Sequence, residues 1–191
     1  MHDLICFSPL RWGTGLQRPQ HLMSRAARDR RVWFIEEPVL GAAAPRLHRT
    51  RTAEYVDVCV PQLPHGLSPE ASAQASMALV EQLVMVEGID APVAWLYTPR
   101  MLPIVNTLAP RAIVYDCMHP PPPGLPDHAL LAVASLVFTG DASLHEALRR
   151  RHPSVHLFPS TAATWDQTWA EMEMLLGGLT DLPRLEAQSA R

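Results

Sequence analysis

The sequence predicts one α/β domain with a Rossmann-like, doubly wound and mostly parallel sheet of about six or seven strands. Short, uninterrupted apolar runs alternate along the chain with segments of helical periodicity. The chain has 191 residues, of which 48% are hydrophobic and 18% charged. This length and composition are typical of a single globular domain with a substantial core.

Seven apolar runs are predicted to form the strands. They are short and rich in Val, Ile and Phe, as is typical of parallel strands that are buried on both faces. The runs are Leu4–Ser8, Val32–Glu36, Tyr55–Val60, Val93–Tyr97, Ala112–Tyr115, Leu136–Thr139 and Val155–Phe158. Helices are expected between them, at 18–30, 69–87, 99–108, 126–134 and 141–151. Because a helix separates most consecutive strands, the strands are expected to run parallel.

A final helix is predicted from Thr164 to Leu176. Thr164 and Gln167 have the spacing of a capping box, and two glycines after Leu176 end the helix. An apolar stripe at helical spacing consists of Trp165, Trp169, Met172 and Leu176. We therefore expect this helix to pack on the sheet domain and the residues after Leu179 to form a tail.

Composition excludes several classes of protein. The net charge of -3 argues against a dedicated nucleic-acid-binding protein, which would be basic. The three cysteines lie in or beside predicted strands and form no CxxC pair, so buried, reduced thiols are expected. No signal peptide is visible, and no apolar run approaches the roughly 20 residues that a membrane-spanning helix needs. We expect a cytoplasmic protein.

The loop after the first predicted strand is rich in polar and aromatic residues. Its Gly13-Thr14-Gly15 segment lies where a dinucleotide-binding fingerprint would begin, but Arg18 stands in place of the third glycine. A dinucleotide cofactor is therefore not expected. Gln17, Arg18 and His21 gather at the start of the following helix, where free backbone N–H groups favour anions. Arg18 could bind a phosphate or carboxylate there, or it could pair with a carboxylate of the second strand, Glu36 or Glu37.

Other polar residues follow the fourth, fifth and sixth predicted strands. Tyr97, Asp116, His119 and Thr139 all lie at carboxyl ends, so they are expected at one edge of the sheet. Asp116 and His119 are the candidates for a general base. Alternatively, an aspartate at a strand end caps the local backbone. The sequence contains no P-loop, no HExxH motif and no paired-cysteine site, and its nine histidines lack metal-ligand spacing. No metal is expected.

A set of motifs, taken in order, resembles a bacterial glycosyltransferase of the GT-B type. The resemblance covers about residues 3–161 and the final helix. The motifs are Phe7-Ser8-x-x-Arg11-Trp12, Gln17-Arg18-Pro19-Gln20-His21-Leu22-Met23, Phe34-Ile35-Glu36-Glu37-Pro38, Tyr97-Thr98-Pro99, Val114-Tyr115-Asp116-Cys117-Met118, Leu136-Val137-Phe138-Thr139-Gly140 and His156-Leu157-Phe158-Pro159-Ser160.

The resemblance implies an incomplete enzyme. GT-B enzymes have two Rossmann-like domains across a cleft: the N-terminal domain holds the acceptor substrate and the C-terminal domain holds the nucleotide-sugar. A final helix returns to the N-terminal domain. Here the returning helix begins at Thr164, where the family would continue into its second domain. The implied division is an N-terminal domain over 1–161, the returning helix over 164–178 and a tail over 179–191, with the donor domain missing.

Two cleft loops depart from the family pattern. His119 and the prolines 120–123 replace an acidic segment, and Gly13-Thr14-Gly15 replaces an acidic or bulky loop residue. Both departures suggest that the ancestral catalysis is relaxed or lost. The resemblance still assigns the catalytic positions to Asp116 and His119. It assigns substrate binding to Arg11, Trp12, Gln17, Arg18, His21, Glu37, Tyr97 and Thr139.

Two functions follow from this resemblance. The chain is expected to be the acceptor-binding half of a glycosyltransferase of cell-envelope polysaccharide biosynthesis, with a sugar or lipid-linked acceptor and a nucleotide-sugar donor. It would be inactive alone, would work with a separate donor-domain protein, and would lie in the cytoplasm or at the inner face of the membrane. The alternative is a non-enzymatic pseudoenzyme that dimerises, or binds a full-length homologue, through the exposed former domain interface.

Overall fold

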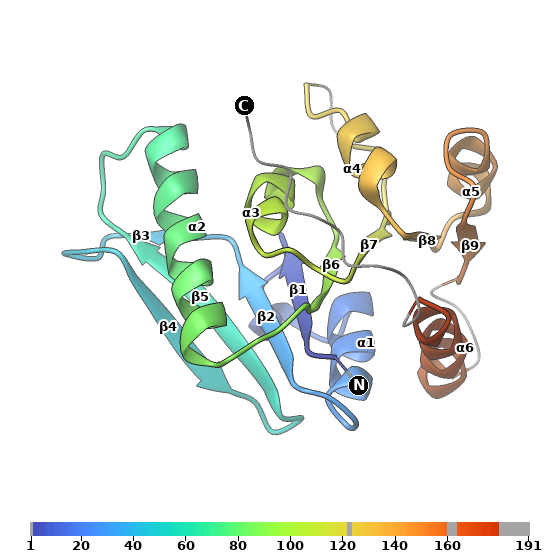
Figure 1. Cartoon of the computed structure of the whole chain (residues 1–191), viewed down its shortest axis with the longest axis horizontal. Helices are drawn as coiled ribbons and strands as arrows, with labels where there is room; N and C mark the ends of the chain where they lie inside the picture. The colour runs from blue at the N-terminus through green and yellow to red at the C-terminus, as the bar shows by residue number, and fades with distance from the viewer. Residues whose placement is uncertain (1, 122–123, 160–163, 180–191) are drawn as a thin grey trace.

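The computed structural model describes residues 2–121, 124–159 and 164–179, which form a sheet covered by helices on both faces (Figure 1). The strands are β1 (Leu4–Ser8), β2 (Val32–Glu36), β3 (Val39–Leu40), β4 (Arg46–Arg51), β5 (Val56–Leu63), β6 (Val93–Leu96), β7 (Ala112–Asp116), β8 (Leu136–Thr139) and β9 (Val155–Leu157). The helices are α1 (Arg18–Ala26), α2 (Pro69–Val86), α3 (Leu102–Thr107), α4 (His128–Val133), α5 (Ala142–Arg149) and α6 (Trp165–Gly177). Two short 3₁₀ helices are η1 (Trp12–Thr14) and η2 (Pro99–Met101).

The strand order confirms a Rossmann-like, doubly wound α/β fold. The order is β3-β5-β2-β1-β6-β7-β8-β9, and β4 pairs with β5. The chain therefore builds outward from β1 in one direction through β2 and β5, and then returns to add β6 to β9 on the other side. All pairs are parallel except β4 with β5. The crossovers between parallel strands are helical at most steps, as such sheets require.

In the part of the chain that the structure describes, the sheet has nine strands rather than the six or seven predicted. All seven predicted strands are present. The two additional strands, β3 and β4, come between β2 and β5 in the sequence. β3 has only two residues, and β4 is an antiparallel edge strand with the sequence Arg-Leu-His-Arg-Thr-Arg. Leu47 is the only large apolar residue in β4, so the strand lacks the continuous apolar pattern on which the prediction depended.

Alternating side chains of each strand divide the core into two clusters. On β1, Ile5 and Phe7 face α2 to α5, whereas Leu4 and Cys6 face α1 and α6. This alternation follows from the two-residue period of a strand. The three cysteines are buried and free, as expected.

The helix α6 packs beside α1 against the same face of the sheet (Figure 1). Trp169 of α6 lies 6.1 Å from the ring of Trp95 in β6, and Met172 is fully buried. Charged pairs border this contact: Arg25 of α1 and Arg28, just after this helix, both donate to Asp166 of α6. The helix therefore buries its apolar stripe while its polar residues bind the outer side of α1. No helix of the described residues is long and apolar enough to cross a membrane.

Candidate functional site

A cavity of about 500 Å³ opens at the carboxyl ends of β1, β6 and β7. β1 and β6 are neighbours in the sheet, yet the chain leaves them in opposite directions along it. This is the topological switch point, where doubly wound folds leave a crevice that binds ligands. The loops after the three strands contribute Leu10, Tyr97 and Met118 to the lining.

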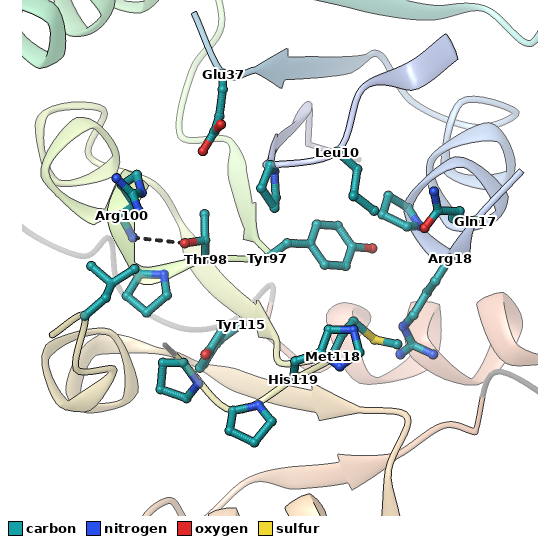
Figure 2. Close-up of a pocket in the computed structure, with 16 residues that line it drawn as sticks. Leu10, Gln17, Arg18, Glu37, Tyr97, Thr98, Arg100, Tyr115, Met118 and His119 are labelled. Atoms are coloured by element: carbon teal, nitrogen blue, oxygen red, sulfur yellow. Dashed lines mark hydrogen bonds between the residues drawn. The ribbon is translucent and has the colours of Figure 1, made fainter. Parts of the chain in front are cut away.

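The lining combines apolar walls with a few polar groups (Figure 2). Of the ten predicted site residues, five line this cavity: Gln17, Arg18, Glu37, Tyr97 and His119. The prediction did not include the other lining residues, which are Pro9, Leu10, Pro19, Thr98, Pro99, Arg100, Tyr115, Met118, Pro120, Pro121 and Leu125. Thr98, Pro99, Tyr115 and Met118 belong to the recognised strand-end motifs, and Arg100 directly follows one, so assigning whole motifs to the site would have found most of the lining.

A buried ion pair forms the floor of the site. Arg18, the first residue of α1, donates from Nε to Asp116 Oδ1 at 3.1 Å and Oδ2 at 2.9 Å. Its Nη1 donates to the carbonyl oxygen of Phe158 at 2.7 Å. The side chains of Arg18 and Asp116 are 3% and 0% exposed. Because a charge buried without a partner is costly, each group holds the other in place and ties α1 to the ends of β7 and β9.

Tyr97 approaches this ion pair from β6. The pKa of its hydroxyl is raised well above the ordinary value, mainly by burial and also by the negative charge of Asp116. The phenol therefore remains protonated at neutral pH. Neither the Tyr97 hydroxyl nor Nη2 of Arg18 has a hydrogen-bond partner among the described residues, and both atoms are buried.

The Glu36 carboxylate at the end of β2 binds Arg11 rather than Arg18. Arg11 Nη1 donates to Glu36 Oε2 at 2.8 Å and to the carbonyl oxygen of Glu37 at 2.7 Å. The backbone N–H of Trp12 donates to Glu36 Oε1, also at 2.8 Å. The alternative that Arg18 pairs with Glu36 or Glu37 is therefore wrong. Arg11 instead fixes the loop after β1, which leaves the Glu37 side chain at the cavity.

Three other predicted site residues lie away from the cavity lining. Trp12 packs edge-on against Phe34 at 5.0 Å, and His21 stacks on Trp165 of α6 at 4.6 Å. Thr139 is buried, and its hydroxyl accepts a hydrogen bond from the backbone of Asp141. These contacts give each residue a packing role, so their contact with substrate stays a prediction without support from the geometry.

The two proposed bases lie in different surroundings. Asp116 is fully buried, and both of its oxygens bind Arg18. His119 is exposed and lines the cavity. Only His119 can therefore meet a ligand without a rearrangement of the ion pair. Part of the proline segment that follows it lies outside the described residues.

The loop that approaches the cavity is shaped by a glycine and a capping box. Gly15 has φ of +113°, a conformation that disfavours residues with a Cβ. Gln17 and Gln20 then exchange hydrogen bonds as the capping box of α1, which directs the start of this helix at the cavity. Within the described residues, no group of three or more His, Cys, Asp or Glu side chains is arranged to hold a metal ion.

Comparison with solved structures identifies the fold. No protein-family model and no curated protein sequence matches the chain. A chain of sucrose-phosphate synthase from Thermosynechococcus elongatus has a TM-score of 0.63 at 12% identity. The match covers 93% of this chain and 99% of that one. A trehalose-6-phosphate structure from E. coli, described as bound with UDP-2-fluoro glucose, has a TM-score of 0.50 at 11% identity. A structure named OtsA in its apo form has a TM-score of 0.53 at 10% identity.

These neighbours are GT-B glycosyltransferases. The fold is that of one half of a GT-B glycosyltransferase. The matches to the E. coli structure and to OtsA include 74% and 79% of this chain. They include only 40% and 42% of the two longer chains, so this chain spans less than half of their length. The GT-B resemblance of the sequence motifs is thereby confirmed for the fold.

Proposed function

We propose that this chain is the acceptor-binding half of a GT-B glycosyltransferase and that it transfers no sugar from a nucleotide-sugar by itself. The observation that supports this most is the position of the cavity. It lies at the switch point of a sheet that matches almost the whole of the sucrose-phosphate synthase chain. In such sheets, ligands bind at the carboxyl ends of the strands beside this point.

The direct succession of β9 and α6 supports the absence of a donor domain between them. The two longer neighbours extend well beyond the region that this chain matches. One of them is described with a bound UDP-sugar derivative, the class of donor that the missing part would hold. The sucrose-phosphate synthase chain, by contrast, is matched over 99% of its length.

The lining of the cavity suits a carbohydrate. Apolar side chains such as Leu10 and Met118 can pack on the C–H groups of a sugar, while Thr98 and Glu37 can bind its hydroxyls. His119 is the group that can take the proton from an acceptor hydroxyl as that oxygen attacks the sugar carbon of the donor. The nucleoside diphosphate would leave with the electron pair of the broken bond. In this proposal Asp116 orients Arg18 and does not act as the base.

The test is a binding and turnover screen on the purified chain. Calorimetry and nucleotide release are measured with UDP- and GDP-sugars, and backbone NMR shifts are recorded with neutral saccharides, saccharide phosphates and uronic acids. We expect no nucleotide release, and shift changes at cavity residues with at least one saccharide class. Nucleotide release by the chain alone would show that a donor site is present and would refute this part of the proposal. A folded sample that binds no saccharide would refute the acceptor site.

A second candidate function is a non-enzymatic module that binds a second copy or a full-length homologue. The observation that favours it is a group of exposed apolar side chains at the carboxyl rim of the sheet. This rim group consists of Leu16, Val39, Leu40 and Leu67, which are 37–73% exposed. Exposed apolar groups that gather on one surface commonly mark protein interfaces.

A further inference from the structure

One end of the cavity is the N-terminus of α1. Gln17 caps this nine-residue helix, and Gln17, Arg18 and Pro19 all line the cavity. Pro19 has no N–H and the capping box of Gln17 and Gln20 uses others, so this end offers mainly the positive end of the helix dipole rather than a row of free N–H groups. This end of the cavity therefore favours negative charge, although a helix N-terminus is not a binding site without further groups.

Arg18 supplies the second observation. The residue is 4% exposed, and its guanidinium is held by Asp116 and by the carbonyl oxygen of Phe158. Its Nη2 has no hydrogen-bond partner among the described residues. A buried donor left without a partner is costly, so its presence at a cavity calls for an explanation such as a bound ligand. The other bonds fix the guanidinium in advance, so little entropy is lost when Nη2 meets a ligand.

Tyr97 supplies a third donor group beside Arg18. Figure 2 shows its hydroxyl directed toward the end of the cavity that holds Arg18 and Gln17. This hydroxyl is also buried and has no hydrogen-bond partner in the described part of the chain. Its raised pKa, which results from burial and then from Asp116, keeps the proton on the oxygen. Tyr97 can therefore donate to a negatively charged oxygen.

We propose that this end of the cavity binds an anionic oxygen group of the ligand, a phosphate or a carboxylate, through hydrogen bonds from Arg18 Nη2 and Tyr97 Oη at the N-terminus of α1. The proposal rests on the proposed function, because it names one group of the acceptor substrate bound in the same cavity. Glu37, the acidic side chain of the lining, is drawn away from this end and closer to Arg100 (Figure 2). The ligand class is thus a saccharide or similar polyhydroxy compound with one anionic group.

The experiment uses the whole chain with inorganic phosphate and acetate as probes. Affinity is measured by calorimetry and by ³¹P NMR line broadening in wild type, in Tyr97→Phe and in Arg100→Gln. Tyr97→Phe removes one buried hydroxyl and leaves the ion pair intact, so the fold is expected to remain. Tyr55→Phe is its matched control, because Tyr55 is 72% exposed and precedes β5 at the opposite rim. Arg150→Gln, at an exposed arginine after α5, is the matched control for Arg100→Gln.

We expect wild type to bind at least one probe and Tyr97→Phe to weaken it about tenfold or more, the effect of losing a hydrogen bond to a charged group. Preference for phosphate would indicate a phosphoryl group, and preference for acetate a carboxylate. Binding lost in Arg100→Gln but unchanged in Tyr97→Phe would place the anion elsewhere and overturn the proposal, as would no binding of either probe. If both variants bind a saccharide with the affinity of wild type, the anion site is overturned and the proposed function stands.

Discussion

At the residue scale, the site depends on how two arginines are shared among carboxylates. Arg11 and Arg18 both lie in the segment after β1. The sequence alone allows either arginine to bind a carboxylate at the end of a neighbouring strand. Arg18 binds Asp116, 98 positions along the chain, whereas Arg11 binds Glu36. Sequence reasoning placed all four residues at one edge of the sheet, but it could not assign the pairs. The choice depends on the register of β7 beside β6, which no local pattern encodes.

The ion pair of Arg18 and Asp116 is predicted to be essential for stability. Asp116→Asn keeps the shape of the side chain but leaves the buried guanidinium without its counter-charge. We expect the free energy of unfolding to fall by about 3 kcal/mol or more. Urea unfolding measures this change, with Asp29→Asn as the control because Asp29 is exposed. A loss in Asp116→Asn as small as that in the control would show that the pair contributes nothing to the fold.

The stacking of His21 on Trp165 predicts a dependence of stability on pH. Burial, and then the charge of Arg25, lower the pKa of His21. Its contribution to stability is therefore complete above pH 6.5, the ordinary pKa, and is lost as the pH falls through the lower pKa of the folded state. His21→Phe keeps an aromatic ring against Trp165 but cannot titrate.

We therefore expect the loss of unfolding free energy between pH 7.5 and pH 5 to be smaller in His21→Phe than in wild type. Urea unfolding at the two pH values measures it. His128→Phe, at an exposed histidine of α4, should retain the wild-type loss. If His21→Phe and wild type lose the same free energy, His21 does not titrate differently in the folded and unfolded states.

At the scale of single elements, the central parallel strands were predictable and β4 was not. β1, β2, β6, β7 and β8 are buried throughout and almost entirely apolar, because they are covered on both faces. β4 is instead stabilised by partners distant in sequence: Arg49 lies 4.6 Å over the ring of Trp33 and donates to Asp57 and Glu87. A strand whose stability comes from cation–π contacts and ion pairs has no apolar period to detect. Its arginines also cover a sheet edge that would otherwise be open to other chains.

The packing of α6 provides a prediction at the same scale. Met172 is fully buried among α1 and the sheet, whereas Met174, two positions along the same helix, is 73% exposed. Met172→Ala should lower the free energy of unfolding by about 2–5 kcal/mol, because it leaves a cavity in a core that cannot close completely. Met174→Ala should change it by no more than about 0.5 kcal/mol. Equal effects in urea unfolding would mean that α6 is not docked through this stripe.

At the scale of the whole molecule, the carboxyl rim of the sheet carries both the cavity and the exposed rim group. β1, β2 and β5 run parallel, so the segments that follow them emerge at the same edge. Leu16 follows β1, Leu40 follows β2, and Leu67 follows β5. The sequence predicted this common edge because strand polarity fixes where loops lie. It could not predict that Trp165 of α6 would stack on His21, which is half-buried and does not line the cavity.

The rim group predicts self-association of the chain through this edge. Burying one leucine side chain contributes about 1.5–3 kcal/mol, which is about tenfold or more in affinity. We expect sedimentation velocity to show a concentration-dependent dimer, and the double variant Leu16→Ser with Leu40→Ser to raise its dissociation constant at least tenfold.

Met85→Ser with Val86→Ser is the matched control: these side chains are 75% and 72% exposed, at the end of α2 that faces the opposite rim. A dimer disrupted equally by both double variants would locate the interface elsewhere. A chain that stays monomeric at every concentration would leave the rim free for a different partner, such as a separate donor domain, and would reject self-association.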